Sequence, residues 1–211
     1  MRKITQTPTE IEVKLRITSL PEILRRLESI GAESHGRVLE RNTLFDTPDS
    51  DFRKTGRLLR VRIETPAPAN GLAAGRAKSV LTFKSPPHAG AKSNLAKASH
   101  YKERAESELP IRNPAGFVRN LRSLGLRPDF RYEKFRASFR LPGLHLDLDE
   151  TSVGVILELE GQHTAIDRAA KALGFSPSDY IRATYWDLYA ADCRRRGITP
   201  QNMLLPARKA R

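Results

Sequence analysis

The sequence has one cysteine, Cys193, and no run of about 18 apolar residues that could cross a membrane as a helix. One cysteine cannot form an intramolecular disulfide, and it excludes a zinc site built from several thiolates. The N-terminal stretch MRKITQTPTEIEV lacks the apolar segment of a signal peptide. Aromatic residues make up only 7% of the chain, and its five histidines include no HExxH motif. These absences favour a cytoplasmic protein with no membrane partner.

Acidic residues are scarce relative to basic ones, with 24 Asp and Glu against 37 Lys and Arg and a formal net charge of +13. This excess predicts an anionic partner, and nucleic acid, lipid headgroups and polyphosphates all satisfy it. The stretches CRRRG at 193–197 and ARKAR at 207–211 are basic, and we expect a solvated helix end and a frayed tail there. We therefore expect a single domain at residues 1–196 and a basic C-terminal tail at 197–211.

Helices and strands can be located from their periodicity. Proline near the start and glycine after the end mark helices over 21–31, 114–125, 165–174 and 178–196. Short alternating segments predict strands over 10–17, 41–46, 58–64, 80–84, 102–109, 132–141, 145–149 and 155–160. Two segments rich in Pro, Gly and Ala, 65–79 and 85–99, are expected to be mobile loops.

Charged residues occupy every second position of these strands and therefore share one face of each strand. In TEIEVKLRI, residues 9–17, Glu10, Glu12 and Lys14 alternate with Val13 and Leu15. One such strand alone would be a solvated sheet face. Because almost every strand has this pattern, and the helices have apolar faces that need a surface to cover, we expect the charged faces to point inward. The sequence thus predicts an α+β fold, a closed eight-stranded antiparallel β-barrel with helices packed outside and a charged lumen.

A lumen of this kind implies that two kinds of ion bind in it, an anion and a cation. Two like charges 4 Å apart repel by about 4 kcal/mol at an effective dielectric of 20. Rows of Lys and Arg therefore call for a multiply charged anion, and rows of carboxylates call for a cation. Hard cations prefer oxygen ligands, so we expect Mg²⁺ or Mn²⁺.

A series of motifs along the chain makes a resemblance specific. They are E-x-E-x-K at 10–14, FDTPD at 45–49, LRVR at 59–62, a later strand ending in lysine, then R-x-E-x-E, K-x-R, and D-x-D followed by LELE. In this order, over about residues 10–190, they resemble the CYTH superfamily of triphosphate tunnel metalloenzymes. The resemblance implies an eight-stranded antiparallel tunnel and the activity of a thiamine triphosphatase, an inorganic triphosphatase or a class IV adenylyl cyclase.

The resemblance also implies roles for residues of this chain, by position. The expected metal ligands are Glu10, Glu12, Asp147, Glu158 and Glu160, and the four glutamates among them are the expected catalytic residues. The expected substrate-binding residues are Lys14, Arg60, Arg62, Lys84, Arg104, Lys134 and Arg136. The roles of Glu106, Glu108, Asp149, Arg182 and Tyr185 stay open, with Arg182 and Tyr185 possible at one mouth. Since carboxylates crowded without metal would repel, we expect loss of the Glu158 charge to leave stability unchanged or higher.

Two reactions fit such a site. Attack by water gives a triphosphatase, and attack by the 3′-hydroxyl of ATP on its own α-phosphate gives cyclic AMP and pyrophosphate. Cyclase members carry a His-Phe pair shortly before E-x-E-x-K, whereas this chain has MRKITQTPT there and no evident adenine pocket. The sequence therefore favours metal-dependent hydrolysis of an inorganic, thiamine or nucleoside triphosphate over a class IV adenylyl cyclase.

A third hypothesis is polyphosphate or RNA binding without turnover. RNA-binding surfaces place exposed aromatic residues among basic ones, whereas here the aromatics lie mostly in apolar registers. In a protein that only binds RNA, the paired carboxylates of the strands would also have no role. We therefore expect a small-molecule triphosphate substrate and no nucleic-acid partner beyond the basic tail. The sequence does not indicate an oligomeric state.

Overall fold

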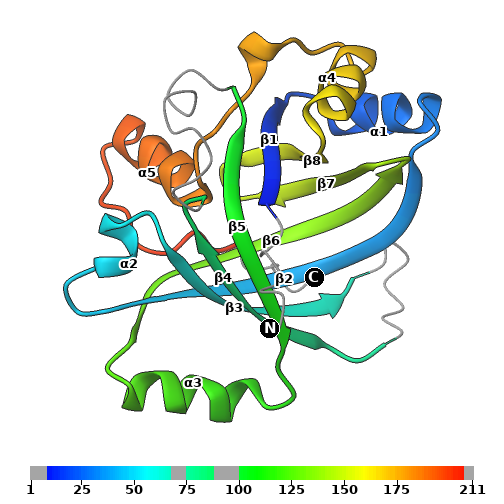
Figure 1. Ribbon diagram of the computed structural model, residues 1–211. Coiled ribbons are helices and arrows are strands. Elements are labelled where there is room, and N and C mark those ends of the chain that lie inside the picture. Colours follow the sequence, from blue (N-terminus) through cyan, green and yellow to red (C-terminus); the bar gives the residue numbers. More distant parts are fainter. Residues whose placement is uncertain (1–8, 68–74, 88–99, 207–211) are drawn as a thin grey trace, which may run out of the picture.

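The eight predicted strands pair into one closed antiparallel barrel in the spatial order β1-β5-β4-β3-β2-β6-β7-β8. This computed structural model describes residues 9–67, 75–87 and 100–206 (Figure 1). The strands are β1 (Thr9–Ile17), β2 (Glu33–Asp46), β3 (Leu58–Pro66), β4 (Lys78–Ser85), β5 (Lys102–Pro110), β6 (Arg127–Leu141), β7 (Leu144–Thr151) and β8 (Gly154–Gly161). The predicted fold class is confirmed.

Five helices lie outside the barrel. They are α1 (Leu20–Ser29), α2 (Asp51–Lys54), α3 (Pro114–Ser123), α4 (His163–Ala172) and α5 (Tyr185–Arg195), together with a 3₁₀ turn at Pro177–Asp179. Figure 1 shows α1 and α4 side by side against β1, β7 and β8, whereas α3 lies at the opposite end of the barrel. Side-chain oxygens of Ser19, Asn113 and Thr184 accept a backbone N–H in the first turns of α1, α3 and α5. These polar caps fix where the three helices begin.

The main hydrophobic core lies between the barrel wall and the outer helices. Val13 and Leu15 on β1 and Leu157 on β8 are completely buried there, against Leu27 of α1 and Ile166 of α4. Their neighbours along β1 and β8 point the other way, because successive side chains of a strand alternate between its faces. Burial of the apolar face outward therefore forces the charged face into the lumen.

The structure differs from the predicted elements in three places. The helix predicted over 178–196 begins only at Tyr185, because Ile181 instead pairs with Lys14 of β1 through two backbone hydrogen bonds of 3.1 and 2.9 Å. Strands β2 and β6 begin eight and five residues earlier than predicted, at Glu33 and Arg127. Helix α2 was not predicted, since a four-residue turn has no periodicity. The centres of the predicted loops, 68–74 and 88–99, lie outside the described residues.

The segment after α5 returns to the barrel. The Met203 side chain is completely buried beside Phe130 and Tyr132, and its backbone bonds to Arg131 and Glu133 of β6. Part of the predicted basic tail therefore packs on the barrel wall, while residues 207–211 lie outside the described ones. The boundary at residue 196 stays a prediction. Among the described helices, none has the length and apolar character needed to cross a bilayer.

Candidate active site

The barrel lumen contains a cavity of about 1060 Å³ lined by side chains from all eight strands. The structure brings together here every residue to which the sequence assigned a metal or substrate role. They are Glu10, Glu12, Lys14, Arg60, Arg62, Lys84, Arg104, Lys134, Arg136, Asp147, Glu158 and Glu160. Glu106, Glu108 and Tyr185 also line the cavity, whereas Arg182 and Asp149 do not.

Carboxylates meet across neighbouring strands of the barrel. Glu12 of β1 lies directly opposite Glu160 of β8, and Glu158 of β8 lies opposite Asp147 of β7. Residues paired in this way have Cβ atoms about 4.5–5.5 Å apart, and like charges at that distance are destabilising. Three adjacent strands therefore present a concentrated row of negative charge to the lumen.

Lysine ammonium groups neutralise part of this row. Lys14 Nζ lies 2.9 Å from Glu12 and 3.0 Å from Glu158, and Lys102 Nζ lies 2.6 Å from Glu12. Burial opposes ionisation of Glu12, but Lys14 and Lys102 outweigh it and hold the pKa of this carboxyl well below its ordinary value. Glu12 is thus ionised and already bonded on two sides.

A second cluster centres on Arg136. Its guanidinium lies 2.6–2.7 Å from Asp149 and 2.7 Å from Asp147, and it also bonds to Glu158. Lys134, completely enclosed, bonds to the same Asp149 at 2.7 Å and lies 3.5 Å from Glu40. Asp149, whose role the sequence left open, therefore fixes the positions of two cations from behind the cavity wall.

Glu10 and Glu160 are the least neutralised carboxylates of the lumen. Lys84 Nζ lies 2.6 Å from both carboxylate oxygens of Glu10 and 3.1 Å from Glu106. Burial raises the pKa of Glu10 to about 7, with Lys84 opposing the shift and Glu12 adding to it. Burial also raises the pKa of Glu160. A cation at this end of the lumen would relieve the crowding.

Two arginines on β3 occupy the opposite wall. Arg60 donates hydrogen bonds to the Tyr132 hydroxyl at 3.2 Å and to Thr82 at 3.0 Å, and its nearest carboxylate oxygen, on Glu108, is 3.6 Å away. Its Nε is buried and has no hydrogen-bond partner within the part of the chain that is described. Arg62 bonds instead to Glu108 at 3.1 Å. Arg60 therefore has donor capacity that a bound anion would satisfy.

The lumen neutralises itself to a degree that the sequence did not suggest. Most of its carboxylates and cations are paired with one another, so the repulsion that remains is concentrated at Glu10 and Glu160, where burial and neighbouring carboxylates raise the pKa. Among the described residues, no three metal-binding side chains are gathered in a ready-made metal site. The oxygen donors of Glu10, Glu12 and Glu160 nonetheless suit a hard cation chemically. Because these carboxylates also line one crowded region, they fit the expected Mg²⁺ or Mn²⁺, whose binding stays a prediction.

Among the charged lumen residues that the sequence analysis missed are Lys102 and Glu40. Lys102 continues the spacing of Arg104, Glu106 and Glu108 along β5, so the same alternation could have identified it. Glu40, only 1% exposed and surrounded by Arg136, Lys134 and Arg62, lies just before the predicted start of its strand. Its register therefore could not be assigned. The structure also gives Glu106 and Glu108 a role, since they hold Lys84 and Arg62.

A barrel with this charged lumen is the architecture of a CYTH domain. The CYTH domain model matches residues 8–185, and the chain belongs to this family. A Methanocaldococcus jannaschii protein named "Putative adenylate cyclase MJ0240" is 24% identical over 190 residues, which are 85% of this chain and 97% of that protein.

Solved structures show the same fold. The PH1012 protein of Pyrococcus horikoshii OT3 has a TM-score of 0.64 and 25% identity, over 85% of this chain and 98% of that one. HpAC1 from Hippeastrum has a TM-score of 0.56 and 20% identity, over 90% and 97% of the two chains.

Proposed function

We propose that this protein is a divalent-metal-dependent triphosphatase that hydrolyses a triphosphate bound in the barrel lumen. The observation that carries the proposal is the convergence of Arg60, Arg62, Lys84, Lys134 and Arg136, from three strands, on one cavity that carboxylates also line. Phosphoryl transfer needs alignment and charge neutralisation more than covalent catalysis, and this lumen offers both. HpAC1, described as having a dominant triphosphatase activity, supports this choice within the family.

The cations of the lumen have distinct tasks in this proposal. Arg60 and Arg62 present planar forks that can bind two phosphate oxygens at once, whereas Lys84 and Lys134 act as point charges. When phosphate oxygens take over these donors, the carboxylates that now hold them are released. Glu10, Glu12, Asp147, Glu158 and Glu160 would then hold the divalent metal. When bound, such an ion neutralises phosphate charge and lowers the pKa of water.

Adenylyl cyclase activity is the alternative, and the name of the Methanocaldococcus jannaschii relative favours it.

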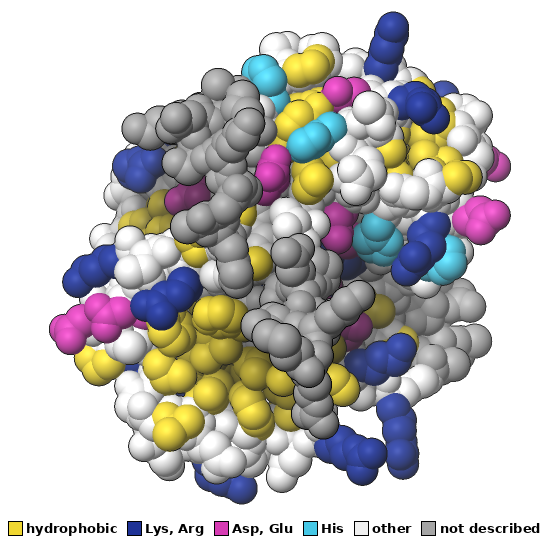
Figure 2. All heavy atoms as spheres, viewed as in Figure 1, with side chains coloured by type: hydrophobic (Ala, Val, Ile, Leu, Met, Phe, Trp, Pro, Cys, Tyr) yellow, Lys and Arg dark blue, Asp and Glu magenta, His cyan; other side chains and the backbone are white. Residues whose placement is uncertain are grey.

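Nucleic-acid binding has less support. On the face seen in Figure 2, the Lys and Arg side chains of the described residues are scattered and form no continuous basic patch. The strongest concentration of described cations with carboxylate neighbours lies inside the barrel, where a small phosphorylated molecule fits better than RNA does.

A product assay tests the proposal. The protein is incubated with ATP, thiamine triphosphate or inorganic triphosphate and with Mg²⁺ or Mn²⁺, and cyclic AMP, pyrophosphate and phosphate are resolved. The proposal expects orthophosphate and a diphosphate, or pyrophosphate from the inorganic substrate. Cyclic AMP and pyrophosphate from ATP would establish the cyclase instead, and no turnover of any substrate would contradict both.

Removal of metal is expected to abolish turnover. EDTA in excess should reduce hydrolysis to background, and an excess of Mg²⁺ or Mn²⁺ should restore it, because the lumen carboxylates need a cation to face phosphate oxygens. The thermal midpoint should change little on chelation, since the ligand-free lumen is neutralised by its own ion pairs. Undiminished turnover after exhaustive chelation would exclude a metal-dependent mechanism.

A further inference from the structure

Glu40 of β2 is a buried carboxylate that the proposed roles in metal and substrate binding do not include. Its side chain lines the lumen cavity, yet the residue is only 1% exposed. It lies 3.5 Å from Lys134, 3.6 Å from Arg136 and 3.8 Å from Arg62. A divalent cation placed among these three groups would be repelled by them. Glu40 is therefore poorly suited to be a metal ligand.

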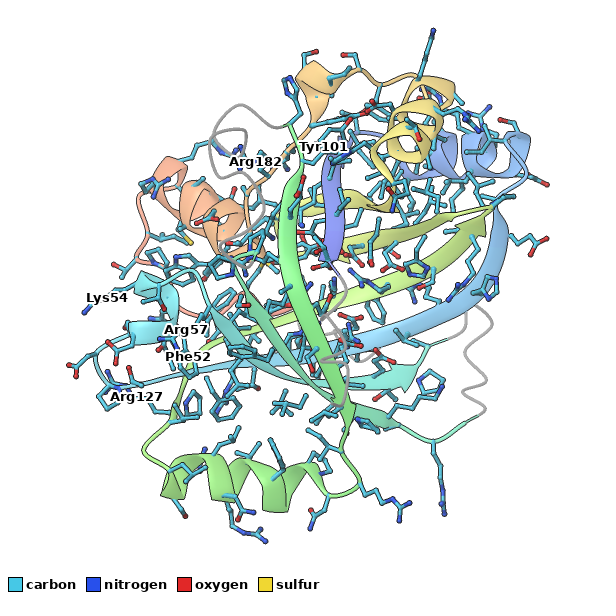
Figure 3. All side chains as sticks on the ribbon, in the orientation of Figure 1. Phe52, Lys54, Arg57, Tyr101, Arg127 and Arg182 are labelled. Atoms are coloured by element: carbon cyan, nitrogen blue, oxygen red, sulfur yellow. The ribbon has the colours of Figure 1, made fainter. Side chains whose placement is uncertain are left out.

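Glu40 lies where two walls of phosphate-binding cations meet. Strand β2 pairs with β3 on one side and with β6 on the other, and Glu40 is directly opposite Lys134. Among the described carboxylates, it is the one with cations of both β3 and β6 within 4 Å. Figure 3 shows side-chain oxygen and nitrogen atoms gathered inside the barrel by β2 and β6, whereas the labelled Lys54 points away from it. Glu40 therefore acts on both groups of cations at once.

The position of Glu40 does not depend on the groups that a ligand would displace. Arg136 has closer carboxylate partners in Asp147, at 2.7 Å, and in Glu158. Both are expected metal ligands, so a bound metal and phosphate chain would compete for them. Glu40 would stay in place, because cations surround it and the Asn42 amide donates a hydrogen bond to it at 3.3 Å. Burial opposes ionisation of Glu40, but the neighbouring cations outweigh burial and hold its pKa well below the ordinary value.

A fixed negative charge behind cations weakens their affinity for an anion. A phosphate oxygen bonded to Lys134 from the lumen side, at the roughly 2.8 Å of a charge-assisted hydrogen bond, would lie roughly 6 Å from Glu40. At an effective dielectric of about 20, the repulsion between two unit charges roughly 6 Å apart corresponds to about a hundredfold in affinity. The charge of Glu40 is therefore large enough in its effect to decide how tightly phosphates bind.

We propose that Glu40 is a positioning residue that holds the cations of β3 and β6 in place and weakens their binding of phosphate, so that the products of hydrolysis dissociate. This inference rests on the proposed function, because it requires phosphates in the lumen. Without the charge of Glu40, the same cations would bind a diphosphate or pyrophosphate more tightly, and product release would limit turnover. A carboxylate with only a structural role would not limit affinity in this way.

Isothermal titration calorimetry in EDTA, which prevents turnover, compares Glu40→Gln with wild-type protein. The variant should bind inorganic triphosphate about 10- to 100-fold more tightly, after allowance for screening by solvent and salt. Orthophosphate carries less charge and reaches fewer cations, so its affinity should rise only about 3- to 10-fold. With Mg²⁺ present, the inhibition constant of pyrophosphate and kcat should both fall. Glu40→Asp, which keeps the charge, should bind both anions nearly as the wild-type protein does.

Glu133→Gln is the matched control. Glu133 precedes Lys134 on β6, but it pairs with Arg41 at 3.2 Å and does not line the cavity. Its loss removes one paired carboxylate and should change neither dissociation constant. Thermal midpoints establish that each variant is folded, and Glu40→Met is a second neutral variant in case Glu40→Gln is not.

The outcomes separate the inference from the proposed function. Tighter binding together with a lower thermal midpoint supports the inference, because a lumen that was merely loosened would bind triphosphate more weakly. Unchanged or weaker triphosphate binding by a folded neutral variant would overturn it, although the triphosphate site would stand. Failure of both neutral variants to fold would also overturn it, since the charge would then serve the fold. If wild-type protein binds no triphosphate, the proposed function fails and the inference fails with it.

Discussion

Arg136→Ala is expected to lower the free energy of unfolding by about 3–5 kcal/mol, the usual cost of leaving buried ion-pair partners uncompensated. Arg136 bonds to Asp147, Asp149 and Glu158, and Asp149 is completely buried. Without the guanidinium these carboxylates would face one another in a poorly solvated lumen. For a chain of this size the loss corresponds to a fall of about 6–20 °C in the thermal midpoint.

Chemical denaturation of Arg136→Ala and of Arg122→Ala measures the effect. Arg122 is exposed on α3, so its removal should change stability by no more than about 0.5 kcal/mol. Arg136→Lys should lie between wild type and Arg136→Ala, because one ammonium cannot reach all the carboxylates that the fork holds. Equal stability of the Arg136→Ala and Arg122→Ala proteins would show that the ion pairs of the lumen do not stabilise the fold.

The contacts of Glu158 predict that its charge stabilises the fold, which differs from the expectation drawn from the sequence. A row of carboxylates predicted that Glu158→Gln would relieve repulsion and leave stability unchanged or higher. In the structure, burial opposes ionisation of Glu158, but Lys14, Lys134 and Arg136 outweigh it and hold its pKa well below the ordinary value. The charged form is therefore the one that the fold stabilises. Glu158→Gln should consequently lower the thermal midpoint at neutral pH as well as turnover.

Arg60→Ala is expected to weaken binding of inorganic triphosphate by roughly ten- to a hundredfold. Charge-assisted hydrogen bonds contribute about 1.5–3 kcal/mol each, and about 1.4 kcal/mol corresponds to a tenfold change in affinity. Arg60 is only 8% exposed, and its Nε lacks a hydrogen-bond partner within the described chain. The bonds that Arg60 already makes go to the uncharged hydroxyls of Tyr132 and Thr82, so they are weaker competitors of an anion than the carboxylates that hold Arg136.

The control for this prediction is again Arg122→Ala, which removes a screened surface charge of the same kind. Surface charges interact weakly across water and salt, so the dissociation constant should stay within about twofold of wild type. Arg60→Lys should recover part of the affinity, because it restores the charge but not the fork. Should Arg60→Ala and Arg122→Ala bind triphosphate equally well, the anion would lie elsewhere than in the lumen.

The fold could be predicted because its signal is local and repeated. Alternation over β1, with Glu10, Glu12 and Lys14 on one side and Val13 and Leu15 on the other, fixes which face is buried under α1 and α4. The same alternation placed the site residues in one lumen. Strand starts were less accurate. The first residues of β2 are exposed and lack the alternation of the barrel wall, whereas those of β6 alternate but include Pro128, a residue that is unusual within a strand.

What the sequence could not supply is the pairing across strands. Which lysine faces which carboxylate depends on register, and register made Lys102 a partner of Glu12. For the same reason the lumen was predicted to be a place of unrelieved repulsion, whereas most of its carboxylates and cations are paired with one another. The rings of Phe52 and Trp186, which also line the cavity, were not predicted, because Phe52 lies on a short helix and Trp186 on a distant one and neither belongs to a motif.

The length of phosphate chain that the lumen accepts tests the central claim most directly. Calorimetric titration of the wild-type protein with orthophosphate, pyrophosphate and inorganic triphosphate at one salt concentration gives the answer. Because Arg60 and Arg62 lie on β3, Lys84 on β4 and Lys134 on β6, only a chain of several phosphates is expected to contact them together. Each added phosphate should tighten binding by about tenfold or more, so that triphosphate binds on the order of a hundredfold more tightly than orthophosphate. Equal affinity for orthophosphate and triphosphate would contradict a triphosphate site in the lumen.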